Sequence, residues 1–113
     1  MIKKDMVFEA VPRDELWAAL TDPEQLEAWF ANDVELDLRP GGGASFRWDN
    51  GEERHATVTE VEPERRLAFE WDDEGEVEFV LADAAEGTRL TVTETSPAWS
   101  TALELRASAL AFA

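Results

Sequence analysis

His55 is the single histidine of the chain and the side chain best suited to general acid–base chemistry. An imidazole titrates near neutral pH without help from its surroundings, so it can accept a proton where most other side chains cannot. It follows Arg54 at the start of an expected strand, beside an acidic turn at residues 49–53. The alternative is an exposed imidazole that pairs with Glu52 or Glu53, and the position beside the turn favours this alternative.

Two carboxylates are further candidates for acid–base chemistry. Glu94 has the same strand phase as Leu90, so its side chain is expected to point toward the interior. Glu60 is in phase with Val58, on a strand whose inward face the pattern does not decide. A carboxylate in apolar surroundings can act as an acid or a base, whereas a carboxylate near a strand end is usually solvated. We therefore assign no catalytic residue, and Glu94 and His55 remain the candidates.

Other kinds of chemical site have weaker support in the sequence. The chain has no cysteine, which removes disulfides, thiolate nucleophiles and thiolate metal ligands. One histidine leaves only carboxylates as further metal ligands, and the acidic turns at residues 49–53 and 72–76 lack the ligand spacing of a calcium loop. The glycines at 41–43 lie between two expected strands and open no helix, so they predict a turn with positive φ, not a phosphate loop. We expect no metal and no cofactor, and the spacing yields no pair of nucleophile and base.

The strongest candidate for function is an aromatic-rich interior. The chain has five tryptophans and six phenylalanines, and each such ring can bury roughly 150–250 Å². Ligand pockets are mostly apolar with a few placed polar groups, so these rings are suited to line one. A fully packed interior is the alternative, because bulky rings at protein density leave little void. Strand phase and helical spacing give the expected ligand-binding residues as Trp29, Phe30, Phe46, Trp48, Phe69, Trp71, Phe79, Leu81, Leu90, Val92, Trp99 and Leu103.

The elements that must position these residues follow from the hydrophobic periodicity. Residues 2–10 predict a first strand, and helical spacing over 13–20 and 22–31 predicts two short helices, the second with Asp22 as N-cap and Pro23 at its first position. Over residues 33–94 apolar and polar side chains alternate, which is typical of an antiparallel sheet with one covered face. Helical spacing returns after Pro97. The predicted order is one strand, two helices, a meander of six strands and one C-terminal helix.

Charge and length limit the partners and the domain organisation. Asp and Glu number 26 against 10 Lys and Arg, for a net charge of −16. Phosphate backbones and anionic lipids bind basic patches, so we expect no nucleic acid and no membrane as partner. No apolar run approaches the roughly 18 residues of a membrane span, and the N-terminus lacks an apolar signal core, so a cytoplasmic protein is expected. The 113 residues fit a single domain over 1–113.

Four segments of the chain carry a resemblance to a known family. They are ELWAALTDPEQLEAWFA (15–31), DLRPGG (37–42), TEVEPERRLAFEW (59–71) and GTRLTVTET (87–95). In this order they are similar to segments of the SRPBCC, or START/Bet v 1-like, superfamily, and more narrowly to its Aha1-like branch, related to the C-terminal domain of the activator of Hsp90 ATPase. The resemblance implies an α+β helix-grip fold, in which a curved antiparallel sheet wraps around a C-terminal helix and the two enclose a cavity.

The resemblance leaves three kinds of function open, because the superfamily includes carriers, co-chaperone domains and cyclases. The first expectation is a module that binds an apolar small molecule without chemistry. The second is an interaction domain for a protein partner, as an Aha1-like co-chaperone or stress-response protein, or a homodimer formed through a strand edge or helix face. The third is an enzyme of the cyclase or hydrolase type, with Glu94 or His55 as acid or base. The short link at residues 95–98 leaves no room for a long gating loop, so a small or altered cavity entrance is expected.

Overall fold

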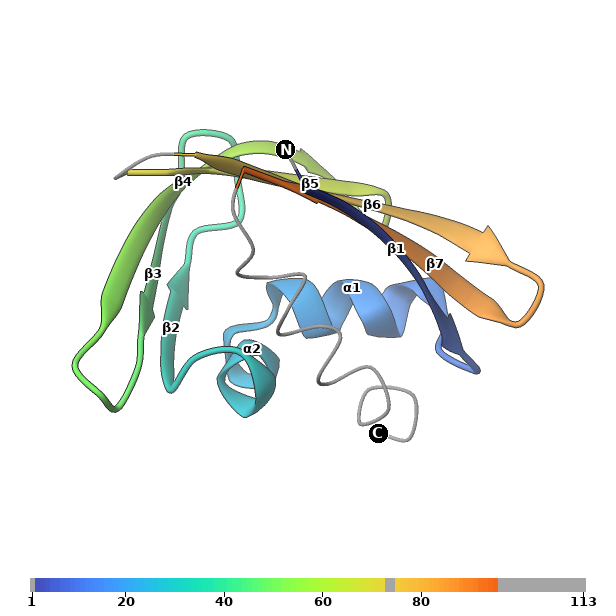
Figure 1. Cartoon of the computed structure of the whole chain (residues 1–113), viewed down its shortest axis with the longest axis horizontal. Coiled ribbons are helices and arrows are strands. Elements are labelled where there is room, and N and C mark those ends of the chain that lie inside the picture. The colour runs from blue at the N-terminus through green and yellow to red at the C-terminus, as the bar shows by residue number, and fades with distance from the viewer. Residues whose placement is uncertain (1, 73–74, 96–113) are drawn as a thin grey trace.

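A curved antiparallel sheet lies over two short helices in the computed structural model of the chain, which describes residues 2–72 and 75–95 (Figure 1). We call the concave face, which the helices cover, the inner face, and the opposite one the outer face. The predicted α+β fold class is confirmed by this arrangement. The predicted C-terminal helix, with Trp99 and Leu103, lies outside the described residues.

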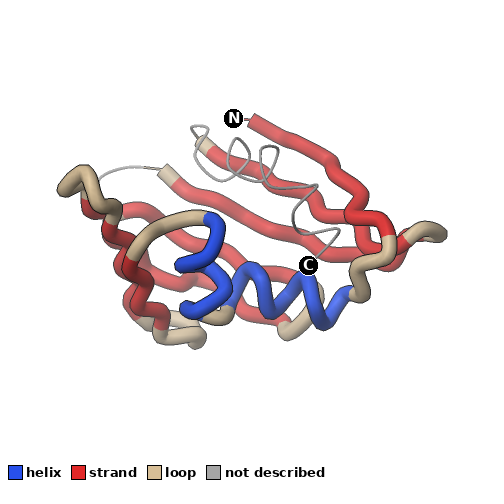
Figure 2. Tube along the Cα trace, turned by 90° about the horizontal axis from the view of Figure 1, so that it is seen from below, coloured by secondary structure: helices blue, strands red, loops and turns tan. Residues whose placement is uncertain are grey.

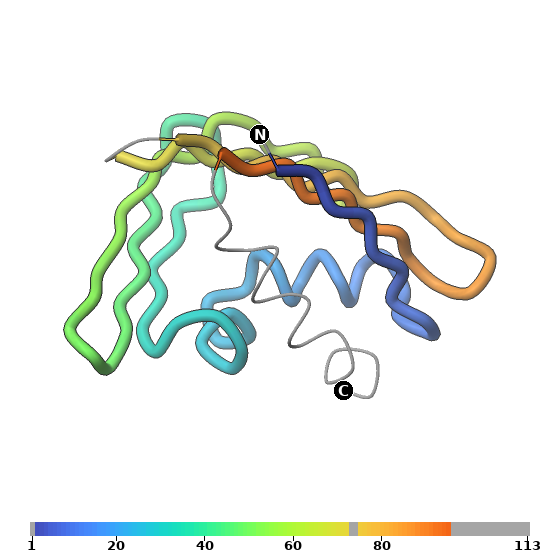
Figure 3. The backbone as a smooth tube through the Cα atoms, in the orientation of Figure 1, coloured from blue at the N-terminus to red at the C-terminus, as the bar shows by residue number. Residues whose placement is uncertain are grey.

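The described residues form seven strands and two helices. In chain order these are β1 (Ile2–Glu9), α1 (Arg13–Thr21), α2 (Pro23–Trp29), β2 (Asp33–Leu36), β3 (Gly43–Arg47), β4 (Glu53–Glu62), β5 (Arg66–Trp71), β6 (Glu76–Ala84) and β7 (Gly87–Glu94). The sheet order is β1-β7-β6-β5-β4-β3-β2, so β2 to β7 form the predicted meander and β1 pairs with the last strand (Figure 3). Ile2 is opposite Glu94 in that pairing.

The two helices begin where the sequence predicts them. The Asp22 side chain accepts a hydrogen bond from the Glu24 amide at 3.0 Å, and Pro23 occupies the first position of α2, where a missing N–H costs nothing. The Trp29 indole Nε1–H donates to the carbonyl of Ala19 at 2.9 Å, which ties α2 to α1. Both helices lie across the inner face (Figure 2). Neither of these helices, which are the ones that the described residues form, is long and apolar enough to span a bilayer.

The turn between β2 and β3 contains the glycines of residues 41–43. Gly41 has a φ of +87°, as the sequence predicted, and a conformation of this kind strains residues with a Cβ. Its amide donates to the Val58 carbonyl at 2.7 Å, and the Val58 amide donates to the Gly42 carbonyl at 2.8 Å. The turn is therefore hydrogen-bonded to the middle of β4.

β4 does not keep a regular alternation along its whole length. The register with β5 shifts between Val58 and Glu60, so one extra residue forms a β-bulge. After the bulge Glu60 is opposite Ala68, and its carboxylate lies 3.5 Å from the Arg66 guanidinium. Val61, opposite the buried Leu67, packs against the core instead. The sequence phase that grouped Glu60 with Val58 is therefore wrong, because the bulge turns Glu60 to the outer face.

Candidate functional site

The inner face carries a continuous cluster of aromatic rings. Phe46 lies at its centre, with ring centroids at 5.3 Å from Phe30, 6.4 Å from Phe69 and 5.7 Å from Trp71. The contacts are edge-to-face, the arrangement that the ring quadrupole favours. The cluster comprises Trp29, Phe30, Phe46, Trp48, Phe69, Trp71 and Phe79, and we call it the ring cluster.

The end of α2 joins the ring cluster to the sheet. Trp29 and Phe30 have centroids 5.6 Å apart, and Phe30 lies 5.4 Å from Trp48, which follows β3. The Trp48 indole donates to the Phe30 carbonyl at 2.7 Å, as the Trp29 indole does to Ala19. Both indole N–H groups are therefore bonded to backbone oxygens, and these two tryptophans have only their apolar ring faces to offer a ligand.

The far side of the ring cluster is formed by β6 and β7. Phe79 lies 6.3 Å from Phe69, and Leu81, Leu90 and Val92 are also buried on the inner face. The structure thus brings together the sheet residues that strand phase predicted for the lining. Their role as ligand-binding residues stays a prediction. Trp99 and Leu103, assigned to the same lining, lie outside the described residues.

Among the described residues, two polar side chains, Glu94 and Thr88, are buried on the inner face. Glu94 is only 1% exposed and, opposite Val77 on β6, points inward as its phase predicted. The alternative of a solvated carboxylate at the strand end is wrong for Glu94. Thr88 is fully buried, and its hydroxyl donates to the Val11 carbonyl at 2.8 Å.

Arg54 is an inner-face residue that hydrophobic patterning does not predict. It is opposite Phe46 in the β3–β4 pairing, and its guanidinium carbon lies 3.9 Å from the centroid of a Trp71 ring. A guanidinium over an indole face is a favourable cation–π contact. The sequence signal that could have identified it is its alternation with Ala56 and Val58, which places Arg54 on the same face as these apolar residues.

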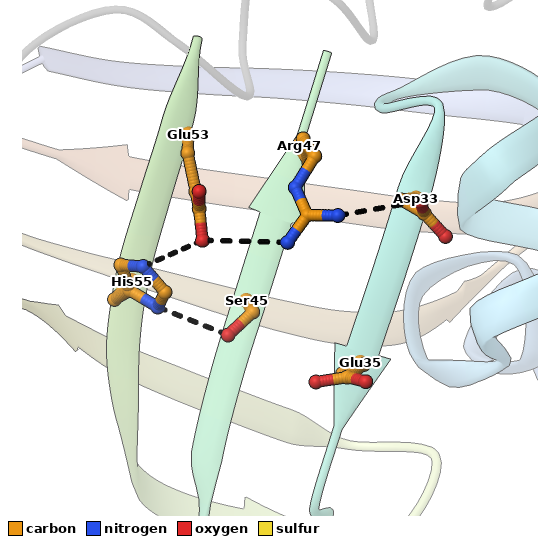
Figure 4. A pocket seen from close by; sticks show the side chains of 6 residues that line it. All are labelled: Asp33, Glu35, Ser45, Arg47, Glu53 and His55. Atoms are coloured by element: carbon orange, nitrogen blue, oxygen red, sulfur yellow. Dashed lines mark hydrogen bonds and ion pairs between the residues drawn. The ribbon is translucent and has the colours of Figure 1, made fainter. Parts of the chain in front are cut away.

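The outer face of β2, β3 and β4 holds the second polar arrangement (Figure 4). His55 is half exposed, and its Nε2 lies 3.0 Å from the Glu53 carboxylate, so the predicted pairing with the acidic turn is confirmed. Its Nδ1 lies 3.0 Å from the Ser45 hydroxyl. Ser45 was not singled out in the sequence, because its contact with His55 depends on the register of two strands and not on local spacing.

These side chains line a depression of about 310 Å³ on the outer face, together with Asp33, Glu35 and Arg47. The Arg47 guanidinium lies 3.8 Å from Asp33 and 3.7 Å from Glu53. Over the described residues, no group of three or more histidines and carboxylates is arranged to hold a metal ion. His55 contacts both Ser45 and Glu53, so a proton can pass between the hydroxyl and the imidazole.

Comparisons with solved structures place the fold among known proteins. The chain is 22% identical to protein MLL2253 from Mesorhizobium loti, over 98% of this chain and 90% of that one, with a TM-score of 0.76. An AHSA1-like protein from Aeromonas hydrophila is 21% identical over 94% of this chain and 85% of its own, with a TM-score of 0.74. DynU16, a protein of the dynemicin biosynthetic locus, is 30% identical over 98% of this chain and 43% of its own, with a TM-score of 0.75.

The family comparison covers most of the chain. A search of curated proteins found no match. Residues 10–110 match the family model described as activator of Hsp90 ATPase homolog 1-like protein. This range includes the helices, the meander and the ring cluster. The chain therefore belongs to the family of activator of Hsp90 ATPase homolog 1-like proteins.

Proposed function

We propose that the protein binds an apolar small molecule against the ring cluster on the inner face of its sheet. The observation that carries the proposal is the unbroken series of ring contacts from Trp29 at the end of α2 to Phe79 on β6. An apolar ligand gains free energy mainly from the apolar area that it removes from water, and ring faces offer much of it. The proposal includes Trp99 and Leu103 as further residues that contact the ligand. It also assumes that residues 1–113 form a single domain and that the protein is cytoplasmic.

The polar groups near the ring cluster match the usual composition of a ligand site. Small-molecule pockets combine an apolar lining with a few polar groups that orient the ligand. Arg54 and Glu94 are two charged groups of this kind, and each lies on the inner face in contact with or beside apolar side chains. Arg54 would orient a ligand through an acceptor oxygen, while its stacking on Trp71 limits its freedom.

The relationship to DynU16 agrees with a small-molecule ligand. That protein is described by its place in the dynemicin biosynthetic locus. We therefore expect a ligand with fused or conjugated rings to bind better than a flexible chain, because flat rings stack on aromatic side chains with little loss of rotamer freedom.

A thermal-shift and fluorescence titration tests the proposal. The probes are a flavonoid, an aromatic polyketide and a fatty acid, each added to the purified chain, and native mass spectrometry examines what remains bound. A ligand on the ring cluster is expected to raise the melting temperature and to quench tryptophan emission. If none of the probes changes the melting temperature and no hydrophobe is retained, the proposal is wrong.

A pair of tryptophan variants locates the binding site. Trp71→Phe removes an indole from the ring cluster, whereas Trp17→Phe removes a partly buried indole from α1. Trp71→Phe is expected to reduce the quenching caused by the ligand, and Trp17→Phe to reduce it much less. Equal effects of the two variants would place the ligand elsewhere.

A further inference from the structure

We propose that Ser45, His55 and Glu53 form a nucleophilic acyl-transfer site on the outer face of the sheet, which hydrolyses small carboxylic esters. We call these three residues the outer-face triad. The site lies on the opposite face from the ring cluster, so it goes beyond the proposed ligand binding and does not depend on it. Ser45 is the nucleophile, His55 the general base, and Glu53 a positioning residue for the imidazole.

The contacts of the outer-face triad fit a nucleophile activated by a base. The Ser45 Oγ lies 3.0 Å from His55 Nδ1, and His55 Nε2 lies 3.0 Å from Glu53 Oε1. An ionised carboxylate only accepts hydrogen bonds, so Nε2 carries the hydrogen of the neutral imidazole and donates a hydrogen bond to Glu53. Nδ1 then holds the lone pair that accepts the hydroxyl hydrogen of Ser45. Nucleophile, base and orienting carboxylate thus follow one another as in a Ser-His-acid triad, with the two ring nitrogens exchanged relative to the serine proteases.

The strands hold the outer-face triad in place. Ser45 on β3 and His55 on β4 are directly opposite each other in the antiparallel register. Glu53 precedes His55 by two residues on the same strand, so both side chains project from the same face (Figure 4). Sites built on strands keep their geometry better than sites built on loops.

Arg47 supplies the positive charge that an acyl-transfer site needs. It lies two residues beyond Ser45 on β3, on the same face. Its distances of 3.8 Å to Asp33 and 3.7 Å to Glu53 exceed those of hydrogen bonds, so its N–H donors remain available to another acceptor. A guanidinium beside the reacting carbonyl stabilises the negative charge that develops on its oxygen.

The surroundings of Ser45 favour an ester with a positive charge. Glu35 on β2 is directly opposite Ser45, and Asp33 lies on the same strand and the same face. The depression holds three carboxylates against one guanidinium, so its net negative charge attracts cationic groups and repels anionic ones. The site is therefore assigned to small esters that carry an ammonium group near the scissile carbonyl.

The reaction is balanced with water as the second substrate. The Ser45 oxygen forms a bond to the carbonyl carbon while its proton moves to His55 Nδ1. The bond from that carbon to the alcohol oxygen then breaks, and His55 returns the proton to the leaving alcohol. Water attacks the acyl group on Ser45 in the same way, which releases the carboxylic acid and restores the serine hydroxyl.

Hydrolysis of 4-nitrophenyl acetate by the purified chain tests the outer-face triad. Ser45→Ala and His55→Gln are each expected to lower the rate by about tenfold or more, because a positioned general base contributes at least that much. Peptide mapping after brief reaction is expected to find the acetyl group on Ser45. Thr91→Val is the control, since it removes an exposed sheet hydroxyl that bonds to Asp5 instead of an imidazole. Glu53→Gln is expected to lower kcat with little change in KM, a split that a merely structural role would not produce.

Several results would overturn the proposal. One is a rate for Ser45→Ala equal to that of the unmodified chain, since the imidazole alone would then account for hydrolysis. Another is an acetyl group found only on Lys3, Lys4 or the N-terminal amine. The substrate class is tested by comparing acetylcholine with 3,3-dimethylbutyl acetate, its uncharged isostere. Glu35→Gln is expected to reduce the preference for the cationic ester, and no preference in the unmodified chain would refute this assignment.

Discussion

The guanidinium of Arg54 lies over the indole of Trp71, 3.9 Å from the centroid of one ring. The two residues lie on neighbouring strands, and Trp71 is opposite Ala56, two positions beyond Arg54 on the same face. Trp71 is only 5% exposed, and the guanidinium of Arg54 covers one face of its indole. Arg54 thus places a positive charge against the ring cluster.

A double-mutant cycle measures this contact. Arg54→Met, Trp71→Leu and the double variant are compared by chemical denaturation, and a coupling of about 0.5–1 kcal/mol is expected for the cation–π pair. The cycle removes the contribution of other interactions that Arg54 makes. A coupling indistinguishable from zero would show that the guanidinium and the indole are adjacent without stabilising each other.

Phe46 is the residue whose truncation should destabilise the fold most clearly, because it is fully buried and contacts three other rings. Phe46→Ala is expected to lower the free energy of unfolding by about 3–5 kcal/mol, the usual cost of a large cavity. Phe46→Leu should cost less, since it leaves a smaller cavity. Val7→Ala, at a position 40% exposed, is the control and should have little effect in urea denaturation. Comparable losses for Phe46→Ala and Val7→Ala would contradict the central place of Phe46 in the core.

Most of the fold can be predicted because its signals are local. Alternation over residues 33–94 predicts the strands of the meander, since one side of each strand must be apolar to face the helices. Asp22 and Pro23 predict the start of α2 because a cap depends only on the first turn of the helix. The bulge in β4 could not be predicted in this way, because Thr59 has none of the glycine or proline character that marks an irregular strand.

The inner lining and the outer-face triad differ in how far the sequence predicts them. The inner lining follows from strand phase, yet Arg54 was missed because hydrophobic patterning has no place for a cation stacked on a ring. The contact of Ser45 with His55 was missed because it requires the register of the β3–β4 hairpin. A partner for His55 at Glu52 or Glu53 was predicted from the acidic turn beside it, and the structure has Glu53, which is two residues away on the same strand and shares its face.

Gly42 and Gly43 offer a matched test of the turn before β3. A Cβ on Gly42 would overlap the carbonyl oxygen of Asp37, whereas a Cβ on Gly43 would meet open space. Gly42→Ala is therefore expected to destabilise the protein by about 1–3 kcal/mol, as overpacking usually does. Gly43→Ala should leave the melting temperature nearly unchanged. Equal shifts in a thermal melt would show that the turn relaxes to accommodate the methyl group.

The bulge in β4 predicts opposite consequences for two adjacent residues. Val61 packs against the core opposite Leu67, so Val61→Ala is expected to cost about 1 kcal/mol of unfolding free energy. Glu60→Ala should change it by no more than about 0.5 kcal/mol, because an exposed ion pair such as that with Arg66 contributes little. A regular strand in phase with Val58 would bury position 60 and expose position 61, and would therefore reverse this order. Urea denaturation of the two variants decides between the bulged and the regular strand, since only the bulged one makes Val61 the costlier residue to truncate.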